Sequence, residues 1–153
     1  MAAHKSDRAR MLRRLAPAIS IALALLLLGE AGVLEHFFGE PSAADSVIAD
    51  AYANRESDLQ VWGVGTVQRV LADDDDGRRH QRFILRLASG HTLLVAHNID
   101  LAPRIPDLAV GDEVEFFGEY EWNARGGVIH WTHHDPQGRH VAGWLRHGGD
   151  EYQ

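Results

Sequence analysis

Apolar and polar side chains alternate through the second half of the chain, which predicts short β-strands. The pattern is clearest between Asp112 and Trp122, where Val114, Phe116 and Tyr120 share one face and glutamates occupy the other. Successive side chains of a strand point to opposite faces, so this segment is expected to have one buried and one solvated face.

Four further runs with strand character lie between clusters of turn residues. They span 61–71, 79–87, 91–98 and the histidine-containing stretch that begins at Gly126. Gly63 and Gly65 in the first run permit the strong coiling of a small barrel. Five strands with a long connection between the third and fourth predict a mainly β fold, a small five-stranded OB-like (Greek-key) barrel; a small up-and-down barrel or a sandwich is the alternative.

The segments that flank these strands are expected to pack against the barrel. Helical spacing in 41–60 predicts a short amphipathic helix with Ser42 as its N-cap. Its expected inner face consists of Val47, Ile48, Ala51, Tyr52 and Arg55. The glycine-rich tail, 138–153, is expected to wrap over the barrel with Trp144 as its anchor.

The N-terminus has the pattern of an export or membrane signal. A basic flank, R-A-R-M-L-R-R, precedes an uninterrupted apolar run from Leu15 to Leu28. This arrangement is typical of an uncleaved transmembrane anchor or of a cleaved signal peptide, and both remain open. The predicted organisation is therefore a leader (1–40), a helical linker (41–60) and a barrel domain (61–153). We expect the protein at the bacterial inner membrane, facing the periplasm, or periplasmic or secreted if the leader is cleaved.

Charge and cysteine content limit the possible functions. The chain has no cysteine, so any metal site must use histidine and carboxylate ligands. From Pro41 onward, 10 basic and 18 acidic side chains give a net charge of −8. A net negative domain disfavours sequence-independent nucleic-acid binding, which depends on neutralising phosphates.

The segment from Gly126 to His140 concentrates imidazole and carboxylate groups. It contains His130, His133, His134, Asp135 and His140. Imidazole nitrogen is a common ligand of divalent metals such as zinc, and a carboxylate can orient a ligand from outside the coordination sphere. The four histidines are therefore the candidate metal ligands, although surface histidines without a ligand would give the same pattern.

Candidate catalytic groups are His130, Glu119 and Asp135. Glu119 and Glu121 occupy alternate positions, so their side chains share a face and could bind a cation. A solvated barrel exterior explains the two glutamates equally well.

A second set of side chains could bind a small ligand from neighbouring strands. It consists of Arg79, His80, Arg82, His97 and Asn98. The arginines could clamp a phosphate or carboxylate, or they could simply form surface ion pairs with the acidic loops. His97 could join the site, or it could be a buried histidine bonded to a carbonyl.

Several runs resemble the hallmarks of a known family. R-H-Q-R-F, A-H-N-I-D-L-A-P-R, G-E-Y-E-W-N and G-G-V-I-H-W-T-H-H-D-P occur in this order. They are similar to a bacterial family of small exported or anchored proteins catalogued as a domain of unknown function. The resemblance covers 61–153 and implies a single module behind a leader, without an activity.

Two functions are compatible with these features. The first is an exported, membrane-tethered binding module whose histidine-rich pocket holds a metal ion or a small anionic ligand. The alternative is a metal-dependent hydrolase, similar to a phosphodiesterase or nuclease, that uses the same histidines. The sequence leaves open whether the protein is an enzyme.

Overall fold

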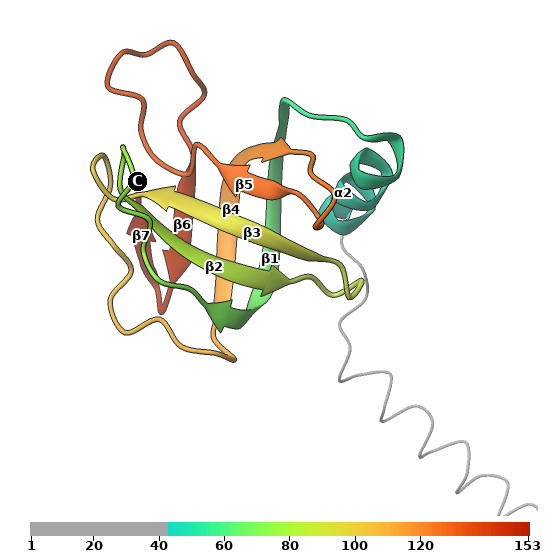
Figure 1. Cartoon of the computed structure of the whole chain (residues 1–153), viewed down its shortest axis with the longest axis horizontal. Helices are drawn as coiled ribbons and strands as arrows, with labels where there is room; N and C mark the ends of the chain where they lie inside the picture. Colours follow the sequence, from blue (N-terminus) through green and yellow to red (C-terminus); the bar gives the residue numbers. More distant parts are fainter. Residues whose placement is uncertain (1–42) are drawn as a thin grey trace, which may run out of the picture. The chain divides into compact units, whose positions relative to one another are not determined.

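The computed structural model describes residues 43–153, where one helix is followed by seven strands. They are α2 (Ala43–Asn54), β1 (Leu59–Val70), β2 (His80–Arg86), β3 (Thr92–Asn98), β4 (Glu113–Glu121), β5 (Val128–His130), β6 (Trp144–His147) and β7 (Asp150–Tyr152) (Figure 1). The predicted anchor or signal peptide lies outside the described residues. Within 43–153, no helix is both long and apolar enough to cross a membrane.

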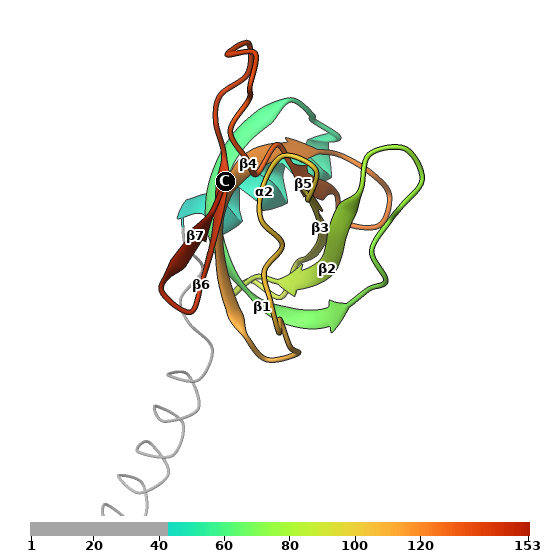
Figure 2. The same ribbon diagram turned by 90° about the vertical axis from the view of Figure 1, so that its left-hand side faces the viewer.

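The first five strands form a closed barrel. Their order around the barrel is β1-β2-β3-β5-β4, and β4 pairs again with β1 to close it (Figure 2). All of these pairings are antiparallel except that of β3 with β5, which is parallel. The predicted mainly β barrel is confirmed, whereas the alternative up-and-down order is wrong because β3 pairs with β5 rather than with β4.

The core fills the barrel with the alternate residues of each strand. Phe83 and Leu85 of β2 and Phe116 and Tyr120 of β4 are fully buried, as the alternation predicted. Gly63 of β1 faces this core, where a Cβ atom would lie 2.5 Å from Cζ of Phe116. The glycine is therefore needed for packing: it leaves the space that an aromatic ring occupies.

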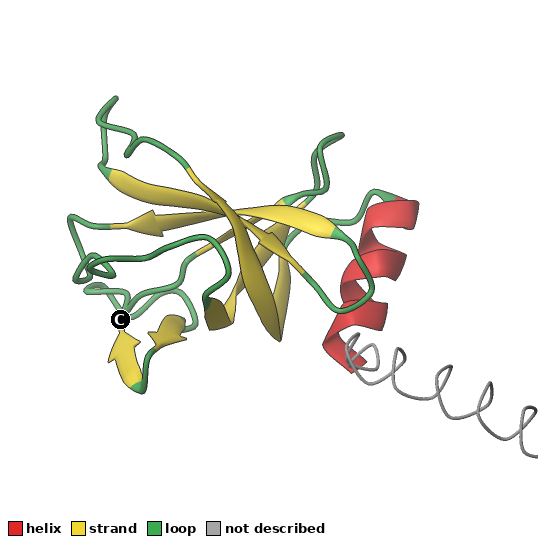
Figure 3. Ribbon diagram, turned by 90° about the horizontal axis from the view of Figure 1, so that it is seen from below, coloured by secondary structure: helices red, strands yellow, loops and turns green. Residues whose placement is uncertain are grey.

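Helix α2 lies across one end of the barrel, as the view from below shows (Figure 3). Ile48 and Ala51 are buried on its inner face, as predicted. The prediction for Val47 is wrong, since its side chain is 48% exposed. The indole Nε1 of Trp122 donates a hydrogen bond to the carbonyl of Tyr52 and ties the helix end to the barrel. Ser42, the predicted N-cap, lies outside the described residues.

The C-terminal tail adds a hairpin that the sequence analysis did not predict. Strand β6 pairs with β4, and β7 pairs with β6. The buried anchor of this hairpin is Leu145, whereas Trp144 is only half-buried and lies under the guanidinium of Arg146. These strands have four and three residues. Segments this short show too little alternation to be recognised.

Candidate metal centre

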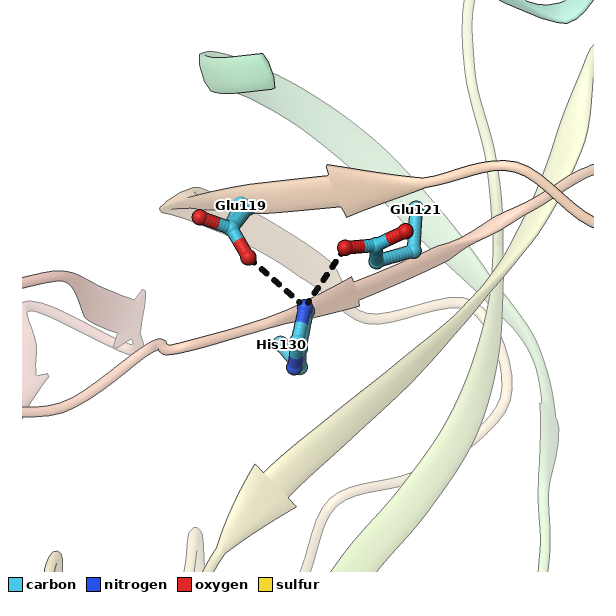
Figure 4. A group of neighbouring side chains, drawn as sticks. All are labelled: Glu119, Glu121 and His130. Atoms are coloured by element: carbon cyan, nitrogen blue, oxygen red, sulfur yellow. Dashed lines mark ion pairs between the residues drawn. The ribbon is translucent and has the colours of Figure 1, made fainter. Parts of the chain in front are cut away.

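Three polar side chains meet on the outer face of the barrel wall. Glu119 of β4 pairs directly with His130 of β5, and Glu121 lies two residues further along β4. Directly opposed residues of an antiparallel pair project to the same side, so the imidazole and both carboxylates face one another (Figure 4). Tyr120 and Ile129, which alternate with them, point into the core and are fully buried.

The ligand atoms of this cluster are close enough to share one cation. Nε2 of His130 lies 3.2 Å from Oε1 of Glu119 and 3.9 Å from Oε1 of Glu121. All three atoms lie within 4.8 Å of one another. The Nε2 atom is buried, and its only polar contacts among residues 43–153 are these two carboxylate contacts, neither of which has the geometry of a good hydrogen bond.

Burial also favours the form of His130 that binds a metal. Removal of the ring from water lowers its pKa, and this effect outweighs the opposing attraction of Glu119 and Glu121. A neutral imidazole keeps a lone pair on the unprotonated nitrogen. The cluster therefore offers one nitrogen ligand and two oxygen ligands on rigid strands.

His140, a predicted metal ligand, contacts the carboxylate oxygen of Glu119 that does not face His130. Its Nε2 donates to Oε2 of Glu119 at 2.7 Å, and its Nδ1 donates to the carbonyl of Val141 at 2.8 Å. Burial alone would lower the pKa of His140, but these two acceptors raise it overall, because each requires a proton on the nitrogen that it faces. The ring also stacks on Trp131, with centroids 4.1 Å apart. The raised pKa favours the protonated form of His140, and its hydrogen bond orients Glu119.

Asp135, predicted as a catalytic or orienting carboxylate, holds the loop that carries His140. Its Oδ1 accepts a hydrogen bond from the backbone N–H of Gln137, and its Oδ2 accepts from those of Arg139 and His140. These bonds lower the pKa of Asp135. Because its oxygens are occupied by backbone donors, Asp135 shapes the site rather than acting as a base.

His97 has a structural environment, in agreement with the simpler of the two sequence interpretations. The ring is fully buried, with Nδ1 bonded to the hydroxyl of Thr132 and Nε2 donating to the carbonyl of Pro103. Burial lowers the pKa of His97 to about 4. Both nitrogens have protein partners, so His97 does not belong to the metal centre.

The remaining predicted histidines do not all lie at one place. His80 and His133 border a pocket of about 120 Å³ that is also lined by His130 and Asn98. His134 is exposed and outside that pocket. Three of the histidines expected in one pocket, His80, His130 and His133, thus border the same pocket, and of these only His130 also reaches the carboxylates.

The predicted arginine clamp is occupied by protein groups. Arg79 forms an ion pair with Asp100 at 2.7 Å, and Arg82 donates twice to the carbonyl of Ala72. Arg78, which the sequence analysis did not single out, lines the pocket instead. No local signal distinguishes it from Arg79, because the pairing depends on a carboxylate that lies 21 residues from Arg79 along the chain.

Comparison with known proteins gives a family but no activity. A family model described as "Protein of unknown function (DUF3465)" matches residues 32–153. This match confirms the predicted resemblance to a family of unknown function. No curated protein and no solved structure matches the chain.

Proposed function

The chain belongs to the DUF3465 family of unknown function, and on the geometry of its site we propose that it is a binding module for a divalent transition-metal ion. His130, Glu119 and Glu121 are the proposed ligands. The observation that carries this proposal is the buried Nε2 of His130, which lacks a hydrogen bond and faces two carboxylates. A buried polar atom without a partner is costly unless a ligand satisfies it.

The chemistry of the ligands narrows the choice of metal. Imidazole favours Zn²⁺, Fe²⁺, Ni²⁺ or Cu²⁺ over Ca²⁺ and Mg²⁺, which prefer oxygen ligands throughout. Three protein ligands leave an open coordination position, as in sites that bind or activate a further ligand. His140 would act from outside the coordination sphere by fixing the orientation of the Glu119 carboxylate.

The wider context of the module is also part of the proposal. The strand order and the parallel pairing of β3 with β5 support an OB-like barrel. The basic flank and the apolar run from Leu15 to Leu28 support export and a membrane tether. We therefore propose a barrel that faces the periplasm, or one released there if the leader is cleaved.

Metal titration of the full-length chain, expressed without a histidine tag, tests the ligand assignment. We expect one Zn²⁺ or similar ion per chain by calorimetry and by elemental analysis. His130→Ala should abolish stoichiometric binding, and Glu121→Gln should weaken it, because each removes one of three ligands. His134→Ala is the matched control, since this exposed histidine lies outside the cluster. Equal binding by all of these variants would contradict the proposal.

We do not propose the alternative hydrolase. Its predicted phosphate clamp, Arg79 and Arg82, is engaged with Asp100 and Ala72. Of its two predicted bases, Asp135 accepts three backbone hydrogen bonds, and Glu119 accepts one from His140. Turnover of a generic phosphodiester that is lost with chelator and in His130→Ala would reverse this choice.

A further inference from the structure

His130 also borders the pocket described above, which lies where β2 begins and where β3 and β5 end. His80 contributes from β2, Asn98 from β3, and His133 from the loop after β5. Arg78, just before β2, completes the polar lining. The pocket has a volume of about 120 Å³, enough for a small oxyanion or a few water molecules.

The positive charge of this pocket is not neutralised by the protein. Among residues 43–153, Arg78 has no ion pair or hydrogen bond, whereas Arg79, Arg82 and Arg104 each pair with an aspartate. Four of the ten arginines in this part of the chain pair with a carboxylate, and Arg78 is one of the six that do not. Its guanidinium is thus available to an outside acceptor.

Two nearly buried side chains in the pocket also have unused hydrogen-bonding groups. Asn98 is 4% exposed, and its Oδ1 accepts from the backbone N–H of Asp100, so its NH₂ group remains a free donor. His133 is 4% exposed, and its Nδ1 donates to the carbonyl of His134, so its Nε2 has no partner in the described part of the chain. Because neither of these atoms is itself buried, both are available to a ligand or to water.

We propose that this pocket binds a small tetrahedral oxyanion, either free phosphate or the terminal phosphoryl group of a small ester. Arg78 would supply two charge-assisted donors, and the amide of Asn98 a third. Hydrogen phosphate also carries a hydroxyl group, which lies within the hydrogen-bonding chemistry of the free Nε2 of His133.

An adjoining groove gives space for the organic part of an ester. This groove, of about 290 Å³, shares Arg78, Asn98 and Trp131 with the pocket. It continues past Leu101 to Arg139, whose guanidinium bonds to the neutral amide of Gln137. Two carboxylates also line the groove, and both have protein partners: Asp100 is paired with Arg79, and Asp135 accepts from backbone N–H groups. A ligand with its phosphoryl group in the pocket could therefore extend toward a second cationic group.

The inference does not depend on the metal centre and is tested in the presence of chelator. Calorimetric titration of the full-length, untagged chain with inorganic phosphate and with phenyl phosphate should give a Kd of about 1 mM or tighter for at least one of them. Arg78→Gln should weaken this binding at least about tenfold, because charge-assisted hydrogen bonds are lost. Arg78 is exposed, so this variant should fold normally.

Arg79→Gln is the matched control, because the neighbouring guanidinium is bound to Asp100. It should change the affinity by less than about twofold, as expected for loss of an exposed ion pair. His80→Gln is a second variant and should weaken binding severalfold. Tighter binding of phenyl phosphate than of phosphate would assign the natural ligand to the esters; equal binding would favour free phosphate. Absence of binding, or equal weakening by Arg78→Gln and Arg79→Gln, would overturn the inference.

Discussion

His97 and His140 show how the partners of an imidazole decide its charge. His97 lies between a carbonyl and a hydroxyl, and a hydroxyl can donate to a neutral ring. His140 lies between a carbonyl and a carboxylate, which only accept, so its surroundings favour a proton on both nitrogens and raise its pKa. The surroundings of one ring thus favour the neutral form, and those of the other favour the cation beside Glu119.

The depressed pKa of His97 predicts a loss of stability in mild acid. The pKa is about 4 in the folded protein and about 6.5 in the unfolded chain. Between these values the unfolded chain binds more protons, so the free energy of unfolding falls as the pH decreases from 6.5 to 4. This group should contribute about 3 kcal/mol to that loss.

Urea unfolding at a series of pH values measures this effect. His97→Gln cannot titrate, so its stability should depend less on pH across the same window. His134→Gln, a change at an exposed ring, should keep the dependence of the original chain. Identical pH profiles for all three proteins would show that His97 is not the responsible group.

At the candidate site, the sequence predicted which residues would be present better than it predicted their hydrogen-bond and ion-pair partners. Glu119, Glu121 and His130 could be selected because alternation and histidine density point to the faces of β4 and β5. For His97 and Arg79 the sequence left two roles open, and for Asp135 it missed the backbone contacts. Each role depends on a group that only folding brings near: Thr132 and Pro103 for His97, Asp100 for Arg79, and three backbone N–H groups for Asp135.

At the scale of elements, alternation predicted the strands that are buried on one face. Strands β2, β3 and β4 have seven to nine residues, long enough to show the period of two. The β6–β7 hairpin was missed because it depends on pairing with β4, which lies about 30 residues earlier, rather than on its own pattern. Val47 was wrongly assigned to the inner face of the helix because a helix with few apolar positions defines the direction of its buried face only approximately.

The packing of β1 against β4 predicts the effect of a single methyl group. Gly63→Ala would place its Cβ 2.5 Å from the ring of Phe116, which is closer than van der Waals contact. Overpacking of this kind should lower the free energy of unfolding by about 1–3 kcal/mol. Thr66→Ala, which places the same residue at an exposed position of the same strand, is the control and should cost less. Equal stabilities of the two variants in urea unfolding would contradict this account.

At the scale of the whole molecule, α2 is part of the domain rather than an independent linker. Ile48 and Ala51 belong to the same buried cluster as the barrel residues Phe83 and Leu145. The carboxylate of Asp45 also accepts a hydrogen bond from the N–H of Ser89 in the turn between β2 and β3. The helix and the barrel should therefore unfold in one transition.

Ile48→Ala tests whether the helix contributes to the stability of the barrel. This change should cost about 2–5 kcal/mol, because a fully buried side chain is truncated. Val47→Ala is the neighbouring control, and its exposed position should make the cost about 0.5 kcal/mol or less. Thermal unfolding followed separately by tryptophan fluorescence and circular dichroism should give coincident curves. Two separate transitions would show that the helix is only loosely attached.

The short final strand has a consequence for association between copies of the chain. Strand β7 forms the free end of the sheet and has only three residues, of which Asp150 and Glu151 are exposed carboxylates. The carboxylate of Glu151 is paired with Arg146, which leaves Asp150 as the charge at this edge, and a second molecule that approached it would gain few backbone hydrogen bonds. A three-residue edge strand of this kind is a poor template for the addition of a further strand.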